Sequence, residues 1–268
     1  MKMEDDIYIG EDGLEYCSNC HTPRQHAIPN AIMGADFKVH IMCKCQRARY
    51  EAELAERKER EFQALVSGNR SICFHESRMR EWTFENDDGK NLLMDKAKVF
   101  VANWDEIKHK RAGLILFGCV GSGKTYMAAA IANALLDKGL RVLMKDFAEI
   151  SNISIFESEE YVKSLSDYDL LILDDLGAER KSEFAMQNVF NVVNRRWESG
   201  KPLIVTTNLS LVEMKQLRAR DDIQYQRIYD RIFDMCVPLC VDGVSKRLSS
   251  AENKCEYMES VFEKGGVL

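Results

Sequence analysis

The chain has 268 residues, of which 46% are hydrophobic and 30% charged, and this composition excludes a disordered or a fibrous protein. Its formal net charge of −6 excludes attraction to nucleic acid or anionic lipid by overall charge, so any DNA contact is expected to be local. No apolar run reaches the ~18–20 residues that span a bilayer. The acidic amino terminus also lacks a secretory pattern, and we therefore expect a cytoplasmic protein outside the membrane.

The amino-terminal region carries two closely spaced pairs of cysteines. Cys17 and Cys20 form a C-x₂-C pair, and Cys43 and Cys45 form a C-x-C pair. Each pair can supply two of the four thiolates of a tetrahedral zinc site, and a region this small buries little core without a metal. We predict a zinc-binding module over residues 1–45, with ordinary reduced thiols as the alternative. Three histidines are alternatives for one ligand: His21, His26 and His40.

A strongly charged stretch follows the cysteines. Residues 46–67 are rich in Arg, Lys and Glu with few apolar positions, which predicts a mostly solvated helical linker. Ser67-Gly68-Asn69 has the residue types that end a helix. We therefore expect the helix to end there and the main domain to occupy residues 68–268.

The remaining chain alternates between short apolar runs and helical stretches. Continuous apolar runs are typical of buried strands in a parallel sheet. The expected strands are residues 114–117, 141–144, 170–173 and 203–206, and the expected crossover helices are residues 125–138 and 183–199. The pattern predicts an α/β protein with a doubly wound parallel sheet flanked by helices.

A glycine-rich motif connects the first of these strands to a helix. It fits the G-x-x-x-x-G-K-[ST] pattern of a phosphate-binding loop, in which backbone N–H groups surround the β- and γ-phosphates. Lys124 neutralises the phosphates, and Thr125 offers a hydroxyl to Mg²⁺. The predicted nucleotide-binding residues here are Gly118, Cys119, Val120, Gly121, Ser122, Gly123, Lys124, Thr125 and Tyr126.

Polar residues end the next two strands. Asp174 and Asp175 follow four apolar residues, at the strand end where ligands bind in open parallel sheets. We expect Asp174 to hold Mg²⁺ and Asp175 to orient or activate the attacking water. Asn208 ends the following strand and is expected to orient the water or sense the γ-phosphate, with an Asx turn as the alternative.

This set of motifs resembles the AAA+ ATPases, and more narrowly the bacterial and phage replicative helicase loaders of the DnaC/DnaI type. The resemblance rests on Lys124-Thr125, on Leu-Asp174-Asp175-Leu-Gly-Ala-Glu and on Thr-Thr-Asn208-Leu. It covers roughly residues 68–250 and the cysteine-bearing amino terminus. An aspartate at position 175, where other AAA+ proteins carry glutamate, is common within this family.

The resemblance also implies arginines that act on ATP. Arg231 matches the arginine finger that reaches the ATP of a neighbouring subunit, with Arg227 as the second choice, and Arg247 matches the arginine called sensor 2. Helical spacing places Arg227 and Arg231 together on an outward face, where Asp230 and Asp234 are expected to offset their repulsion. A solvated face of ion pairs is the alternative.

The function implied is an ATP-dependent loader of a hexameric, DnaB-type replicative helicase. It implies slow ATP hydrolysis stimulated by assembly, DNA or the partner, with self-assembly into ATP-dependent oligomers. It also implies binding of single-stranded DNA through the segment 147–168, although the aromatic residues Tyr161, Phe156 and Tyr168 there have packing as an alternative role. Two other readings stay open: a transposition helper ATPase of the IstB type, and a nucleotide-gated adaptor without productive turnover.

Overall fold

The computed structural model describes most of the chain. The chain forms two compact units, Met1–Ala64 and Leu65–Leu268. The described residues are 7–29, 37–87, 89, 91, 93–152, 158–177, 182–219, 222–242, 254–255 and 257–262. Within them, no helix is long and apolar enough to cross a membrane.

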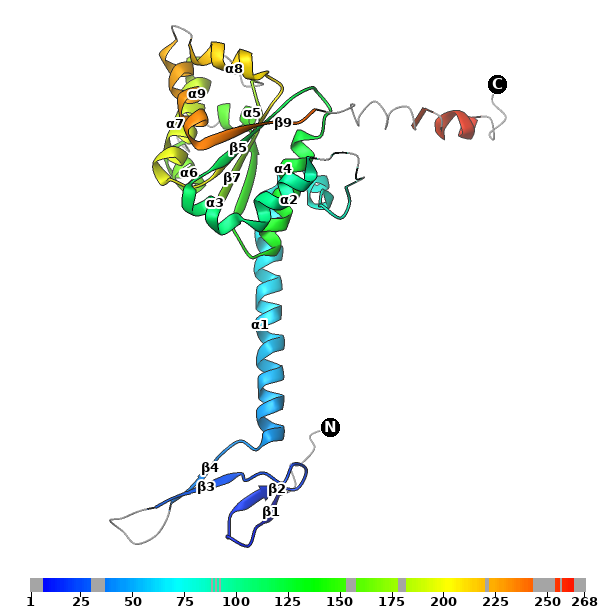
Figure 1. The fold of residues 1–268 in the computed structure, drawn as a ribbon, viewed down its shortest axis with the longest axis vertical. Coiled ribbons are helices and arrows are strands. Elements are labelled where there is room, and N and C mark those ends of the chain that lie inside the picture. Colours follow the sequence, from blue (N-terminus) through cyan, green and yellow to red (C-terminus); the bar gives the residue numbers. More distant parts are fainter. Residues whose placement is uncertain are drawn as a thin grey trace. The chain divides into compact units, whose positions relative to one another are not determined.

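The amino-terminal unit contains two small antiparallel sheets (Figure 1). The first pairs β1 (Ile7–Ile9) with β2 (Glu15–Cys17), and the second pairs β3 (Gln25–Ile28) with β4 (Phe37–His40). The side chains of β1 and β4 are exposed along their whole length. Two-stranded sheets of this kind are marginally stable alone, so this unit needs another source of stability.

Helix α1 (Lys44–Cys73) does not end at Ser67-Gly68-Asn69, and the predicted helix end is therefore wrong. Glycine inside a helix costs roughly 0.5–1 kcal/mol relative to alanine. Tertiary contacts of the last turns offset this cost: Asn69 is buried and its Nδ2 donates to the carbonyl of Leu140 at 3.4 Å. Arg70 also forms an ion pair with Asp137 at 2.5 Å.

The second unit is built on a five-stranded parallel sheet in the order β6-β7-β8-β5-β9. Its strands are β5 (Gly113–Phe117), β6 (Val142–Asp146), β7 (Leu170–Leu176), β8 (Leu203–Thr207) and β9 (Cys236–Cys240). The four predicted strands are confirmed, whereas β9 was not predicted. This strand lies at the edge of the sheet, where its Pro238 is tolerated.

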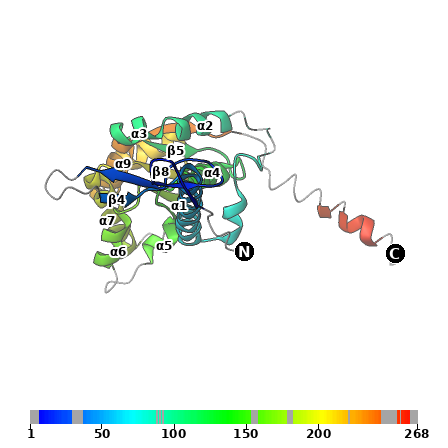
Figure 2. The same ribbon diagram turned by 90° about the horizontal axis from the view of Figure 1, so that it is seen from below.

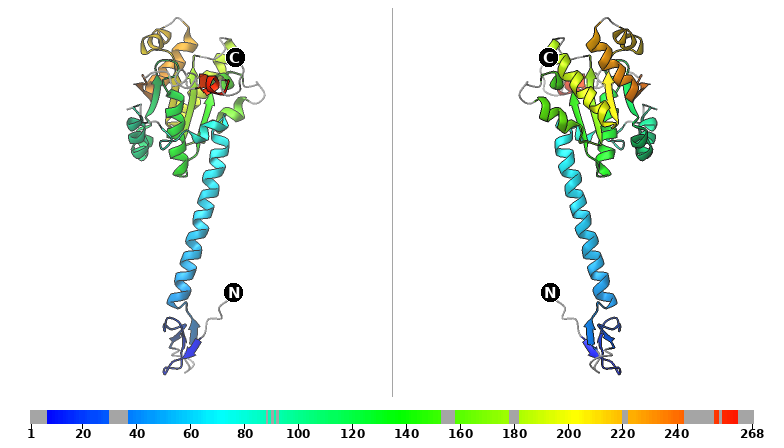
Figure 3. Two further views of the ribbon diagram at one scale, coloured as in Figure 1. Left: turned by 90° about the vertical axis from the view of Figure 1, so that its right-hand side faces the viewer. Right: turned by 90° about the vertical axis from the view of Figure 1, so that its left-hand side faces the viewer.

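Helices cover both faces of this sheet, which confirms the predicted α/β fold (Figures 2 and 3). Alternate strand residues enter two separate cores: Leu116 and Ile172 lie in one, and Ile115 and Leu171 in the other. The first core is completed by the 3₁₀ helix η1 (Ser77–Glu81), α2 (Met94–Ala102), α3 (Trp104–Lys110) and α4 (Lys124–Asp137). The second is completed by α5 (Phe147–Ser151), α6 (Ser158–Leu165), α7 (Glu183–Ser199), α8 (Leu211–Arg218) and α9 (Ile223–Met235).

The strand order determines which loops meet. β8 lies between β5 and β7, and all three strands run parallel. The carboxyl ends of parallel strands lie at one edge of a sheet, so the segments after β5, β7 and β8 converge there. These segments contain the glycine-rich loop, the two aspartates and Asn208.

Candidate active site

The glycine-rich loop between β5 and α4 has a backbone that only glycine adopts easily. Gly118, Gly121 and Gly123 have positive φ angles of 145°, 82° and 94°. A Cβ atom at position 118 would lie 2.4 Å from the carbonyl oxygen of Val241, so this glycine is also required for close packing against the segment after β9. The loop therefore curls tightly and ends at the first turn of α4.

Three features of the loop suit an anion. Gly123 is the N-cap of α4 and provides no side-chain bond to the first turn, which leaves its N–H groups for a ligand. The hydroxyl of Ser122 is buried and has no hydrogen-bond partner among the described residues. The Nζ atom of Lys124 donates to the carbonyls of Gly118 and Cys119 at 3.0 and 2.8 Å, which holds the ammonium group inside the loop.

Asp174, at the end of β7, is buried beside this loop. Burial raises the pKa of its carboxyl, because a low-polarity environment disfavours the charged form, and hydrogen bonds from the hydroxyls of Thr206 and Thr125 oppose this rise. The carboxylate and the Thr125 hydroxyl therefore lie together, and both are oxygen donors of the kind that Mg²⁺ prefers. The oxygen donors of Asp174 and Thr125 therefore suit a magnesium ion.

Asp175 follows in a conformation unusual for its residue type. Its φ angle is 62°, in the left-handed region, and the pairing of β7 with β8 shifts register between Leu173 and Leu176. Its backbone N–H donates to the hydroxyl of Thr206 at 2.9 Å, and its Oδ1 accepts from Nδ2 of Asn208 at 2.9 Å. The structure thus brings the predicted Asp175 and Asn208 into direct contact at an exposed position.

Thr206 was missed by the sequence interpretation. Its single hydroxyl donates to the carboxylate of Asp174 and accepts from the backbone of Asp175, so it joins both acidic residues to β8. The signal was present, since Thr206 stands in the Thr-Thr-Asn run that was read for Asn208 alone.

Tyr126, one of the predicted nucleotide-binding residues, makes its contacts within the fold. The hydroxyl of Tyr126 donates to the carbonyl of Thr83 at 2.8 Å, and its ring lies 5.7 Å from that of Trp82, which ties the segment after η1 to α4. Val120 is exposed at the tip of the loop. Arg247 lies outside the described residues.

The two predicted finger arginines lie on α9. Arg231 Nε donates to Oδ1 of Asn194 on α7 at 2.8 Å, and its Nη1 donates to the carbonyl of Arg227 at 3.1 Å. Its guanidinium also lies over the rings of Phe190 and Trp197, at 5.1 and 5.4 Å. Arg227 is exposed.

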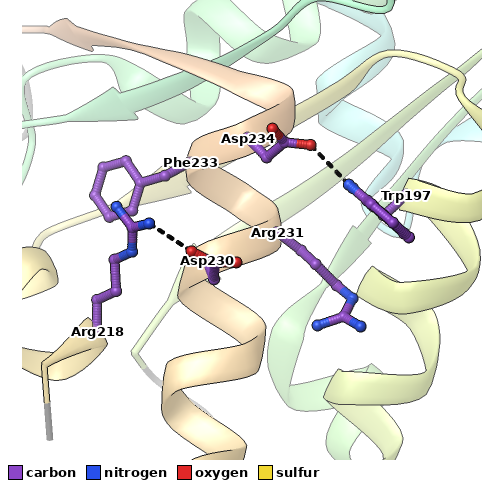
Figure 4. Close-up of a pocket in the computed structure, with 6 residues that line it drawn as sticks. All are labelled: Trp197, Arg218, Asp230, Arg231, Phe233 and Asp234. Carbon is purple, nitrogen blue, oxygen red and sulfur yellow. Dashed lines mark hydrogen bonds and ion pairs between the residues drawn. The ribbon is translucent and has the colours of Figure 1, made fainter.

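The acids expected to offset the charges of these arginines, Asp230 and Asp234, form their bonds with other residues. Asp230 pairs with Arg218 at 2.5 Å, and Asp234 accepts from the indole Nε1 of Trp197 at 2.7 Å (Figure 4). Arg218 belongs to α8 and Trp197 to α7, and side chains of other elements have therefore engaged both acids. Spacing along α9 alone did not reveal these competitors.

The four amino-terminal cysteines form a compact group. The sulfur atoms of Cys17, Cys20, Cys43 and Cys45 all lie within 4.8 Å of one another, and no histidine belongs to this group among the described residues. Zinc bound tetrahedrally at about 2.3 Å from each sulfur requires sulfur separations near 3.8 Å. A small contraction suffices, and the thiol donor set fits zinc.

Contacts within the cluster shift the pKa values of two of its thiols in opposite directions. A hydrogen bond with the Thr22 hydroxyl lowers the pKa of Cys20 to about 5, whereas contact with the Cys20 sulfur raises the pKa of Cys45 to about 11. A second thiolate is costly beside the first, because like charges repel. A bound cation relieves this repulsion.

Two aromatic residues of the segment 147–168 pack inside the protein. Tyr161 and Tyr168 lie partly buried against the second core, and Arg141 lies over the Tyr168 ring at 5.0 Å. For these two residues the packing alternative is supported. Phe156 lies outside the described residues.

A family model described as IstB-like ATP binding protein matches residues 47–254. The chain belongs to this family. Replicative helicase loader DnaC from Escherichia coli K12 is 30% identical over 152 residues, which are 54% of this chain and 58% of DnaC. Replicative helicase loader DnaI from Bacillus subtilis 168 is 28% identical over 174 residues, which are 60% of this chain and 56% of DnaI.

The solved structures agree with this placement. A crystal structure of the DnaC helicase loader matches with a TM-score of 0.54 and 25% identity, and the match covers 62% of this chain and 100% of that one. The predicted AAA+ fold and the resemblance to DnaC and DnaI are confirmed for this IstB-like protein. It spans less than two thirds of the length of either of these two curated relatives.

Proposed function

We propose that this IstB-like protein is an ATP-dependent loader of a hexameric, DnaB-type replicative helicase. One observation carries the proposal: a chain similar to the loaders DnaC and DnaI holds Lys124, Asp174, Asp175 and Asn208 at one sheet edge. Those side chains are the parts that phosphoryl transfer to water requires. Slow ATP hydrolysis, stimulated by assembly, DNA or the helicase, is the proposed activity.

The loop residues bind and orient the nucleotide. Backbone N–H groups at the start of α4 and the buried Ser122 hydroxyl donate hydrogen bonds to the phosphates, and Lys124 supplies a positive charge to them. Thr125 and Asp174 would hold Mg²⁺, which neutralises phosphate charge when bound. The two residues lie close enough for their side chains to hydrogen-bond before any ion binds.

Hydrolysis then depends on residues beyond the loop. Asp175 accepts from Asn208, and the pair orients a water for attack on the γ-phosphate. Arg231 reaches the nucleotide of a neighbouring copy in an assembled oligomer, with Arg227 as the alternative, and Arg247 contacts the nucleotide as sensor 2. Among the described residues, Arg231 contacts only α7 and its own helix. This is expected of an arginine that acts on the nucleotide of a neighbouring subunit.

The other regions of the chain have proposed roles in docking, in linking the two domains and in binding DNA. Residues 1–45 form a zinc module that docks on the helicase, residues 46–67 link it to the ATPase, and residues 68–268 form the ATPase domain. Single-stranded DNA is bound by assembled subunits, which agrees with a net charge of −6 on each chain.

The test mixes the full chain with the replicative helicase of its host, with and without ATP, and measures the mass of the complex together with ATP turnover. We expect a complex with wild type, loss of nucleotide binding with Lys124→Ala, and binding without turnover with Asp175→Asn. A complex that forms without any turnover, even with DNA present, supports the adaptor alternative. Absence of a complex in either nucleotide state overturns the loader role and favours the IstB-type transposition helper.

A further inference from the structure

Arg231 lines a surface pocket of about 440 Å³ (Figure 4). Its lining residues come from α7, α8 and α9 and are Trp197, Arg218, Asp230, Arg231, Phe233 and Asp234. The pocket holds two arginines and two aspartates, yet only one ion pair forms among them, between Arg218 and Asp230. The second aspartate, Asp234, is held by the indole N–H of Trp197 instead.

The contacts that the structure gives Arg231 within its described residues come from groups without charge. Asn194 and the Arg227 carbonyl accept its hydrogen bonds, and the rings of Phe190 and Trp197 lie against the guanidinium. Within the described parts of the chain, no carboxylate forms an ion pair with Arg231. Neutral acceptors and aromatic faces fix a guanidinium in place without neutralising it, so its charge stays available to a phosphate.

Asp234 carries a charge that can cancel that of Arg231. It follows Arg231 by three positions on α9, a spacing at which opposite charges meet on a helix surface. Its Oδ2 instead accepts from Trp197 Nε1 at 2.7 Å, and indole nitrogen is a donor only. Of the two aspartates that line the pocket, Asp230 therefore pairs with Arg218 and Asp234 is hydrogen-bonded to Trp197.

We infer that Trp197 is a positioning residue for the arginine finger: its ring supports the Arg231 guanidinium, and its N–H keeps Asp234 away. This inference rests on the proposed role of Arg231. Trp197 is 44% exposed, so a purely structural role in the core does not explain its placement. The same side chain makes both contacts: its Nε1 donates to Asp234, and its ring lies beside the Arg231 guanidinium (Figure 4).

The test separates the ring of Trp197 from its N–H. Trp197→Phe keeps an aromatic face and frees Asp234 to pair with Arg231, so we expect kcat in the assembled protein to fall about two- to fivefold, the effect of one exposed ion pair. The KM for ATP should stay unchanged, because the finger acts on the transition state of another subunit. Trp197→Tyr serves as the second variant should the phenylalanine protein fail to fold.

The decisive control removes the freed charge. Adding Asp234→Asn to Trp197→Phe should return kcat to the wild-type value, and Asp234→Asn alone should match wild type. A merely structural role for Trp197 does not give this rescue. A Trp197→Phe protein with wild-type kcat, or a double variant that stays impaired, overturns the inference.

Arg231→Ala distinguishes the two ways of failing. We expect it to reduce turnover about tenfold or more in the assembled protein. Equal turnover by wild type and Arg231→Ala overturns the finger role, and the inference with it. An impaired Arg231→Ala beside a fully active Trp197→Phe overturns only the part played by Trp197.

Discussion

Thr206 connects the two acidic residues of the candidate site through one hydroxyl. The hydroxyl donates to the carboxylate of Asp174 and accepts from the backbone N–H of Asp175. The left-handed backbone conformation of Asp175 costs on the order of 1–3 kcal/mol of folding free energy. We predict that Thr206→Val lowers the free energy of unfolding by about 1–3 kcal/mol, because the buried partners lose their hydrogen bonds. It should also lower kcat, because Asp175 loses its backbone restraint; chemical denaturation and steady-state kinetics measure the two effects.

Thr207 provides the matched control on the same strand. It is fully buried, and its hydroxyl donates to the carbonyl of Leu176 at 2.7 Å without touching either carboxylate. Thr207→Val should therefore destabilise the fold to a similar extent while leaving turnover per folded molecule unchanged. Equal losses of kcat in both variants would contradict a specific role for Thr206.

The buried carboxylate of Asp174 carries an energetic cost in the nucleotide-free protein. Burial raises its pKa above the ordinary 3.8, so the folded chain holds the proton more tightly than the unfolded chain. The cost is absent below pH 3.8 and is fully present above the folded-state pKa, which includes neutral pH. Asp174→Asn should consequently raise the thermal midpoint at pH 7 in a chelator, while it abolishes magnesium-dependent turnover; an unchanged or lower midpoint would contradict this account.

The residue types and spacing predicted a good part of this site. Strand ends predicted that Lys124, Asp174 and Asn208 would gather at one sheet edge, and the strand order places them there. The Thr-Thr-Asn run marks Thr206 as a polar residue at a strand end, but its bond to the backbone of Asp175 depends on the register shift between Leu173 and Leu176. Side-chain direction at such an irregularity is set by the tertiary structure rather than by sequence period.

At the scale of elements, α7 is fastened to the sheet by a buried arginine. Arg196 is 1% exposed and donates to the backbone carbonyls of Pro202, Tyr168 and Asp169 at 2.6 to 3.1 Å. These carbonyls lie in the loops before β7 and β8. We predict that Arg196→Met lowers the free energy of unfolding by about 2–5 kcal/mol, because several buried acceptors lose their donor.

Arg195 is the control for that measurement. It precedes Arg196 on α7, is exposed and pairs only with Glu198 at 3.3 Å among the described residues. Arg195→Met should change the free energy of unfolding by less than about 0.5 kcal/mol. Similar losses in the two variants, measured by urea denaturation, would show that Arg196 does not fasten the helix as described.

Two elements show why the fold was only partly predictable. The helix α1 passes through Gly68 because Val66, Asn69 and Cys73 are buried, and packing of this kind outweighs a local end signal. The strand β9 was missed because Pro238 argues against a central strand, and edge position is a property of the whole sheet. By contrast α7 was predicted to the residue, since Ser182 caps its start and Gly200, with a φ of 63°, ends it.

At the scale of the whole molecule, the two units differ in what stabilises them. The larger unit buries two extensive cores on either side of its sheet. In the smaller unit the fully buried apolar side chains, among the residues that the structure describes, are Cys17 and Cys43. Two short sheets with such a small core need a further constraint, and the cysteine cluster is positioned to provide it.

Metal removal should therefore affect one unit and spare the other. We predict one zinc ion per chain in the purified protein, and its loss after Cys43→Ser, because three thiols bind zinc less well than four. Amide exchange across β2 and β3 should then accelerate at least about a hundredfold, since binding energy of a structural zinc is folding energy. ATP affinity should stay unchanged, because the nucleotide site lies within the other unit.

The exposed Cys255 gives the control, and Cys255→Ser should keep the zinc and the slow exchange. A wild-type protein without zinc that nonetheless shows slow exchange in β2 and β3 would contradict the metal assignment and require another source of order in this unit.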